Sequence, residues 1–190
     1  MIISLRGTLK NNGKSNITLS VDSSILGEIK KQAEADGLSI NAKINLILSK
    51  YALFYTHAEK KESVIMPQKD FQSLLNDVEE NKFVENLQNN NFDLIPGIFL
   101  ERGIPLTFDN VIKIVFEVIG RFSGIYSTFT HRKEKDGSTM LIFSHSFGLK
   151  WSRILAVTFS NFIKMHLHLD SECKIMPSTL TIKVQKNRSV

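Results

Sequence analysis

Polar and apolar residues alternate strictly in the stretch NITLSVD near the beginning of the chain. One face of this stretch carries Asn16, Thr18 and Ser20, and the other face carries Ile17, Leu19 and Val21. A period of two residues is typical of a β-strand. The segments that follow have helical patterns and offer this strand no neighbour. We therefore expect it to pair antiparallel with the same strand of a second copy across a two-fold axis.

Two helical patterns come next in the chain. Asp22 is a good N-cap, and the spacing of apolar residues predicts a first helix over residues 23–36 that ends at Gly37. Ser39 caps a second helix, which extends to about residue 54. The apolar positions of the two helices are Leu26, Ile29, Ala33, Ile40, Ile44, Ile47, Leu48 and Tyr51. A strand and two helices make a domain near the lower size limit for folding alone, which favours oligomerisation.

The remaining two thirds of the chain predict an α+β domain. Helical patterns cover residues 68–90, 109–122 and 148–165, and strand patterns cover 125–132, 138–145 and the stretch with Leu180, Ile182 and Val184. A Lys135-Asp136-Gly137 turn joins the first two strands as a hairpin. We therefore expect a three-stranded antiparallel sheet with helices packed on one face. The thirteen phenylalanines of the chain either fill a core or line an apolar pocket.

Breaks in these patterns divide the chain into parts. A polar, glycine-containing stretch precedes the first strand, and charged residues followed by Pro67 interrupt the helical pattern. We expect a flexible basic arm over residues 1–14, a first domain over 15–57, a linker over 58–67 and a second domain over 68–190.

Charge is concentrated in the first third of the chain. Residues 1–61 hold nine Lys and Arg against five Asp and Glu, whereas residues 62–190 hold fifteen against fourteen. A small basic module favours a polyanion such as DNA or RNA, because binding releases counterions from the phosphates. Lys10 and Lys14 are placed to contact phosphates. The alternative is a basic surface that serves only solubility.

The run SVDSSILGEIKKQAEADGLSINAKIN, residues 20–45, resembles the ribbon-helix-helix (Arc/MetJ/CopG-like) family of DNA-binding proteins. The strand, the first helix, the G-x-S-x-N turn at residues 37–41 and the second helix are all in register with that family. The resemblance covers about a quarter of the chain. It implies an obligate β-α-α dimer whose two-stranded ribbon enters the major groove of double-stranded DNA.

The resemblance also implies roles for individual residues. Asn16, Thr18 and Ser20 match the strand residues that contact base edges. Ser39 and Asn41 match the beginning of the second helix, which holds a phosphate, and Lys43 adds positive charge there. The buried Arg-Glu-Arg triad of the family member Arc corresponds here to Leu38, Lys43 and Ile47, so we expect a more apolar core. The alternative interpretation is that NITLSVD forms an edge strand of the larger domain and that the two helices form an ordinary helical hairpin.

These observations together predict a cytoplasmic, homodimeric DNA-binding regulator of transcription, most simply a repressor. The second domain then senses a small-molecule effector or extends the dimer to a higher oligomer, and no cofactor is expected. A different possibility is an antitoxin-like regulator whose second domain binds a partner protein. MIISLRGTLK lacks the apolar run of a signal peptide, and Ile154–Ile163 is too short to span a membrane.

A metal site is a third possibility. His166, His168 and Cys173 are residue types that bind nickel, zinc or copper, and the nickel-responsive branch of the ribbon-helix-helix family has a similar His-x-His followed by a cysteine. The alternative is that the histidines interact with the C-terminus of a helix and that Cys173, which has no cysteine to pair with, is a small buried apolar residue.

Enzymatic activity is not expected. Ser144-His145-Ser146 lies where a strand passes into a helix, a position that suits a nucleophile and base or a bound anion. No G-x-S-x-G motif or P-loop accompanies it. Ser146 is better explained as the N-cap of the helix that contains Trp151.

Overall fold

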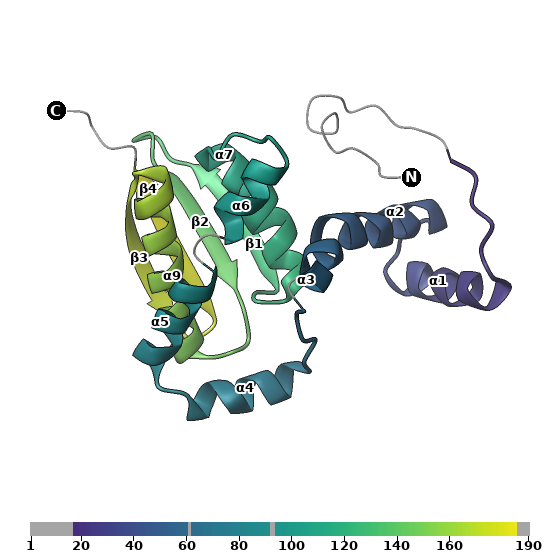
Figure 1. Ribbon diagram of the computed structural model, residues 1–190, viewed down its shortest axis with the longest axis horizontal. Coiled ribbons are helices and arrows are strands. Elements are labelled where there is room, and N and C mark those ends of the chain that lie inside the picture. The colour runs from purple at the N-terminus through teal and green to yellow at the C-terminus, as the bar shows by residue number, and fades with distance from the viewer. Residues whose placement is uncertain (1–16, 61, 92–93, 186–190) are drawn as a thin grey trace. The chain divides into compact units, whose positions relative to one another are not determined.

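The computed structural model describes residues 17–60, 62–91 and 94–185. The chain divides into two compact units, unit 1 (Met1–Ser63) and unit 2 (Val64–Val190). The predicted arm over residues 1–14 lies outside the described residues. Figure 1 shows the elements of both units along the chain.

The two predicted helices of unit 1 are confirmed. Helix α1 spans Ser23–Ala35, and the Asp22 carboxylate accepts a 2.8 Å hydrogen bond from the Ser24 N–H. Gly37 has a φ of +66°, and the N–H groups of residues 37 and 38 bond back to the carbonyls of Glu34 and Ala33, which ends the helix. Helix α2 spans Ile40–Lys50 and continues through the π-helical turn η2 (Tyr51–Tyr55) into α3 (Thr56–Lys60).

The predicted N-terminal strand is wrong, and with it the predicted ribbon-helix-helix fold class. Residues 17–22 belong to no strand, and the regular elements in the described part of unit 1 are all helical. The physical reason is that alternation only suits a segment to a sheet, while a strand also needs a neighbour for its backbone hydrogen bonds. Among the described residues, no segment forms a ladder with residues 17–22.

Unit 2 begins with helices and ends with a sheet. The helical elements are α4 (Gln68–Asp77), α5 (Glu80–Asn91), α6 (Leu94–Glu101), α7 (Phe108–Val111), η3 (Ile112–Gly120), α8 (Arg121–Ser123) and, between the two pairs of strands, α9 (Leu149–Leu167). The strands are β1 (Thr128–Lys133), β2 (Thr139–Ser144), β3 (Asp170–Met176) and β4 (Thr179–Gln185). No helix within residues 17–60, 62–91 and 94–185 is long and apolar enough to cross a membrane.

The sheet has four antiparallel strands in the order β1-β2-β4-β3, so the prediction of three strands is wrong. The additional strand is β3, which lies at an edge and pairs along its whole length with β4, from Asp170↔Gln185 to Met176↔Thr179. Its sequence, DSECKIM, lacks the apolar alternation of a half-buried strand because most of its side chains are exposed. Figure 1 shows α9 lying against this part of the sheet.

The core of unit 2 lies between one face of the sheet and the helices that pack against that face. Inward side chains of β2 and β4, such as Leu141, Phe143 and Ile182, are fully buried there. Phe143 packs against Phe116 of η3 and Phe159 of α9, with ring centroids 5.2 and 5.0 Å apart. These phenylalanines are therefore packed against one another in the core, one of the two roles considered for them.

A tyrosine fixes the end of η3. The buried Tyr126 hydroxyl donates a 2.5 Å hydrogen bond to the Phe116 carbonyl, and burial raises the pKa of Tyr126. Its ring lies directly over Gly120, where a Cβ atom would overlap the hydroxyl. A glycine is therefore required at this position by close packing.

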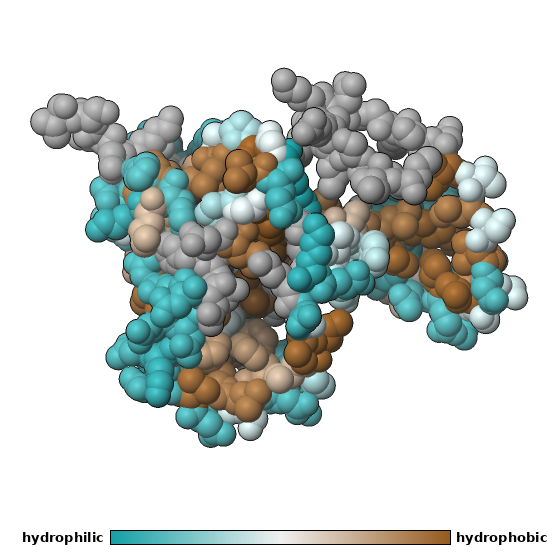
Figure 2. Space-filling view, viewed as in Figure 1, coloured by the Kyte–Doolittle hydropathy of each residue, from teal (hydrophilic) through white to brown (hydrophobic). Residues whose placement is uncertain are grey.

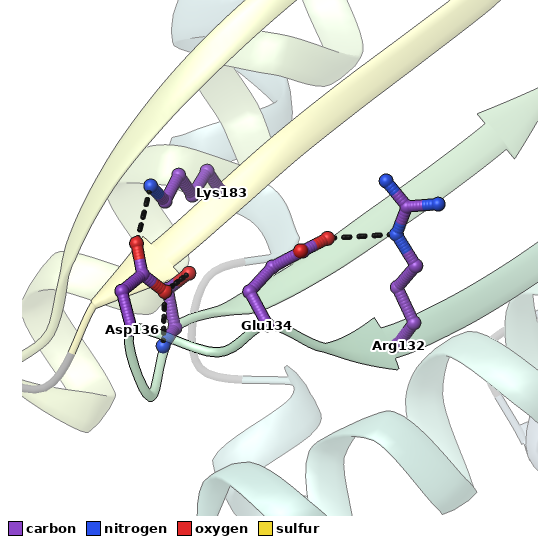
Figure 3. A network of polar contacts seen from close by, with 5 residues as sticks. Arg132, Glu134, Asp136 and Lys183 are labelled. Carbon is purple, nitrogen blue, oxygen red and sulfur yellow. Dashed lines mark hydrogen bonds and ion pairs between the residues drawn. The ribbon is translucent and has the colours of Figure 1, made fainter.

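Polar contacts tie the β1–β2 hairpin to β4 (Figure 3). Asp136 accepts hydrogen bonds from the Ser138 N–H, at 3.0 Å, and from Lys183 on β4, at 2.7 Å. The bond from Lys183 most of all, followed by bonds from the hydroxyl and the N–H of Ser138, holds the pKa of Asp136 well below its usual range. Arg132 pairs with Glu134 at 2.7 Å on the same hairpin. The predicted hairpin turn is confirmed, with Gly137 at a φ of +81°.

Candidate functional site

The predicted base-contacting residues lie in an exposed segment. Thr18 and Ser20 are both exposed, in the extended stretch that leads into α1. Asn16, Lys10 and Lys14 lie outside the described residues. The hydroxyl groups of Thr18 and Ser20 are thus accessible to a ligand, although the strand that was expected to align them is absent.

The predicted phosphate contact at the beginning of α2 has a defined local geometry. The Ser39 hydroxyl accepts a 3.2 Å hydrogen bond from the Ala42 N–H, and the Ser39 carbonyl accepts a 2.9 Å bond from the Lys43 N–H. The N–H groups of Ile40 and Asn41 are the remaining donors of this first turn, where the positive end of the helix dipole lies. Asn41 is exposed beside them.

Lys43 has a different environment from the one predicted for a phosphate ligand. Its ammonium group forms a 2.7 Å ion pair with Asp36 at the end of α1, and its side chain is only 13% exposed. The pair links the end of α1 to the first turn of α2. A phosphate would have to compete with the Asp36 carboxylate for this ammonium group.

The excess positive charge of residues 1–61, from which a polyanionic partner was predicted, is not located on the described helices. Residues 17–60 contain five Lys and five Asp or Glu, which balance. The excess of four comes from Arg6, Lys10, Lys14 and Lys61, all outside the described residues. The electrostatic case for DNA therefore depends on the residues that flank the helices.

Unit 1 exposes much apolar surface. Ala33 is its one buried apolar residue among those described. Ten large apolar side chains are at least 37% exposed: Ile17, Leu19, Val21, Ile25, Leu38, Ile40, Leu46, Ile47, Leu48 and Tyr51. Figure 2 shows residues of high hydropathy gathered over α1 and α2. If a large side chain has an area on the order of 150–200 Å², these ten together expose roughly 800 Å², about what one partner buries in a standard interface.

The structure does not assemble the three candidate metal ligands. His166 lies in the last turn of α9 and His168 is its C-cap, with a φ of +54°. Cys173 is an exposed residue of β3, not a buried one; its sulfur is 3.2 Å from the Ser160 hydroxyl, and partial burial raises the pKa of its thiol. Among the described residues, no three His, Cys, Asp or Glu side chains are grouped as a metal site would require.

The candidate catalytic histidine has a serine partner that the sequence did not indicate. His145 is buried, and its Nε2 lies 2.8 Å from the hydroxyl of Ser152, in the first turns of α9. Ser152 in turn donates a 2.5 Å hydrogen bond to the Met176 carbonyl. A general base must accept the serine proton, but here that proton is directed to a carbonyl. The arrangement therefore does not activate Ser152 as a nucleophile.

The predicted N-cap of α9 is wrong. The N-cap is Gly148, which has a φ of +86° and no side chain to accept a hydrogen bond. Ser146 instead accepts a hydrogen bond from the Gln68 amide at the beginning of α4. Neither Ser152 nor Gln68 could have been identified from sequence spacing, because both contacts join segments brought together only by the fold.

Comparison with known proteins adds no assignment to these sites. No family model matches the sequence, and no curated protein or solved structure matches it significantly. The function is therefore argued from the residues themselves.

Proposed function

We propose that the protein is a homodimeric, sequence-specific DNA-binding regulator of transcription that acts in the cytoplasm, most simply as a repressor. The observation that carries this proposal is the composition of the unit 1 surface. It combines a large uncovered apolar area with exposed hydroxyl groups at Thr18 and Ser20 and the free N–H groups at the beginning of α2.

The apolar area supports a dimer of identical chains. Burying roughly 800 Å² on each of two copies gives the total expected for a standard, stable interface. Leu46, Ile47 and Leu48 are consecutive on α2, so they face different sides of the helix and cannot all be covered by α1. A second copy would supply the core that one copy of this unit lacks.

The polar part of the surface supports DNA as the ligand. Exposed threonine and serine hydroxyls bond to several bases, and helix N-termini bind phosphate through their N–H groups. Lys10, Lys14 and Asn16 come shortly before Ile17 in the sequence, and in this proposal they contribute positive charge and an amide of the kind that pairs with adenine. Unit 2 has its own core, and we assign to it either effector sensing or assembly of dimers into a higher oligomer.

DNA binding is tested by selecting sites from random duplexes and measuring affinity for the selected site at two salt concentrations. Thr18→Ala and Ser20→Ala should each weaken specific binding by about 1–3 kcal/mol and leave non-specific binding nearly unchanged. Thr130→Ala is the matched control, because Thr130 is also an exposed threonine but lies on β1 of unit 2. Failure to select any sequence, or equal losses in all three variants, would contradict the proposal.

Dimerisation is tested by sedimentation of the full chain. Leu48→Asp places a charge in the apolar area and should raise the dimer dissociation constant at least tenfold, since burying an unpaired charge costs several kcal/mol. Leu100→Asp is the matched control, because Leu100 is 83% exposed in unit 2. A wild-type chain that stays monomeric would exclude the dimer and favour a different protein as the partner of this surface, as in an antitoxin-like regulator.

A further inference from the structure

His145 belongs to a chain of hydrogen bonds that joins three segments of unit 2. It follows β2, and its backbone N–H donates a 3.0 Å bond to the Ser178 carbonyl in the β3–β4 turn. Its imidazole Nδ1 is 3.2 Å from the N–H of Phe147, just before α9, and its Nε2 is 2.8 Å from the Ser152 hydroxyl. Ser152 continues the chain to the carbonyl of Met176.

The direction of every bond in this chain is determined from its two ends. The Met176 carbonyl can only accept, so it receives the single Ser152 hydroxyl proton. The Ser152 oxygen then accepts from His145 Nε2, which must carry the ring proton. The backbone N–H of Phe147 can only donate, so Nδ1 must be unprotonated. One tautomer of the neutral imidazole therefore satisfies all partners.

A second proton on the imidazole has no acceptor in this arrangement. It would lie on Nδ1, directly opposite the N–H of Phe147, and two donors would face each other. His145 as a whole is only 5% exposed, so water could not solvate the resulting cation without an opening of the structure.

Charged groups on the surrounding elements do not compensate for this proton. Lys150 of α9 donates to the carbonyls of Asn76 and Val78, and Arg153 pairs with Glu80. Further charged side chains on the neighbouring elements are Lys69, Asp70 and Asp77 on α4, Lys164 on α9, Asp170, Glu172 and Lys174 on β3, and Lys183 on β4. None of these forms an ion pair or hydrogen bond with His145 in the described part of the chain, and burial lowers the pKa of His145.

We propose that His145, Phe147, Ser152 and Met176 form an acid-sensitive latch that closes the beginning of α9 onto the β3–β4 turn and opens when His145 takes up a proton. The event is a simple protonation: the proton comes from solvent, binds Nδ1 and displaces the hydrogen bond from Phe147. Opening then releases the first turns of α9 and the turn around Ser178. This device belongs to unit 2 and does not depend on DNA binding by unit 1.

The latch contains its own spectroscopic probe. Trp151 is the only tryptophan of the chain, and it precedes Ser152 directly. It is 4% exposed, and its indole N–H donates a 2.8 Å hydrogen bond to the Ile125 carbonyl. Opening of the latch should expose this indole and shift its emission to longer wavelength.

The test is a fluorescence titration of the full chain from pH 8 to pH 4.5. The wild type should show a reversible one-proton red shift with its midpoint below pH 6.5, the ordinary value for histidine. In His145→Asn the side-chain oxygen can still accept from Phe147 but does not titrate, so this step should be absent. His131→Gln is the control, because His131 is an exposed histidine on β1, and the step should persist in it.

A wild-type titration without the step, or a step that persists in His145→Asn, would overturn the proposal. If His145→Asn fails to fold, NMR of the wild-type imidazole decides. Chemical shifts that place the proton on Nε2 at neutral pH, together with a pKa of His145 below 6.5, support the latch. A proton on Nδ1, or a pKa at or above 6.5, excludes it.

Discussion

The two units differ in how much apolar surface each of them buries within one copy of the chain. Unit 2 surrounds a continuous core with a sheet and helices, and side chains such as Leu141, Phe143 and Ile154 are fully buried in it. Unit 1 has well-capped helices but buries only Ala33 among its described apolar residues. Local signals thus determine where helices begin and end, whereas a core requires enough chain to enclose it. The difference is the physical reason for assigning self-association to unit 1.

The largest expected effect comes from the core of unit 2. Phe143→Ala should lower the free energy of unfolding of this unit by about 3–5 kcal/mol, because it removes a buried ring and leaves a cavity. Val157→Ala, at a position 43% exposed on α9, should change the same quantity by less than about 1 kcal/mol. Denaturant unfolding followed by Trp151 fluorescence measures both. Similar losses in the two variants would contradict the described core.

Two helical glycines, one in each unit, should respond to alanine with opposite signs. Gly120→Ala in η3 forces a Cβ atom against the Tyr126 hydroxyl and should destabilise unit 2 by about 2–3 kcal/mol through overpacking. Gly27 in α1 has open space around its Cβ position, so Gly27→Ala should stabilise that helix by about 1 kcal/mol. Thermal unfolding followed by circular dichroism at 222 nm compares them. Stabilisation by both changes would show that Tyr126 does not pack over Gly120.

The N-cap of α2 gives a smaller effect in unit 1. Ser39→Ala removes the acceptor for the Ala42 N–H and should cost about 1 kcal/mol of helix stability. Ser49→Ala, an exposed serine near the end of the same helix, should have almost no effect. Helix content measured during thermal unfolding distinguishes the two variants. Equal behaviour would mean that Ser39 does not cap α2.

The smallest effect is a dependence on pH at the surface of unit 2. Because hydrogen bonds from Lys183 and Ser138 lower the pKa of Asp136 in the folded state, this carboxylate stabilises the fold above about pH 4. That contribution is lost as the pH falls through the lowered folded pKa. Asp136→Asn should therefore make unfolding less dependent on pH below pH 4 than in the wild type. An unchanged pH profile would show that the Lys183 contact contributes nothing measurable.

Elements with local signals were predictable from the sequence. The first helix was expected over residues 23–36 and α1 spans Ser23–Ala35, because Asp22 and Gly37 are residue types with direct roles at helix ends. The hairpin between β1 and β2 was predicted from the Lys135-Asp136-Gly137 turn for the same reason. Each of these signals acts within a few residues of the structure it determines.

Elements that depend on distant partners were not predictable. One helix was expected over residues 68–90, but α4 and α5 are separate, with Val78 extended between them and Lys150 of α9 donating to the Val78 carbonyl. The helix α6 was not among the predicted helices, and it contains Pro96 in its first turn, where a proline is tolerated. Strand β3 was not predicted because it is defined by its pairing with β4, and its own sequence has no strand pattern.

The candidate sites also divide into those set by neighbouring residues in the sequence and those set by distant partners. The cap at Ser39 follows from adjacent residues and was predicted, while the strand expected at Thr18 required a neighbour that no described segment supplies. His145 was identified as chemically interesting, but its partner Ser152 depends on how α9 packs at the end of β2. Residue type therefore indicated where chemistry could occur, and tertiary contacts determined what the side chains do.

The position of β4 in the sheet restricts the order in which unit 2 can be completed during synthesis. β4 is the last of the four strands in the chain, yet it lies between β2 and β3 and contributes Leu180, Ile182 and Val184 to the core. Until the ribosome has released these residues, the β1–β2 hairpin and β3 have no strand to join them. The helices of unit 1 precede unit 2 in the chain and emerge while unit 2 is still incomplete, so the dimer that we propose for unit 1 would begin to form before unit 2 has folded.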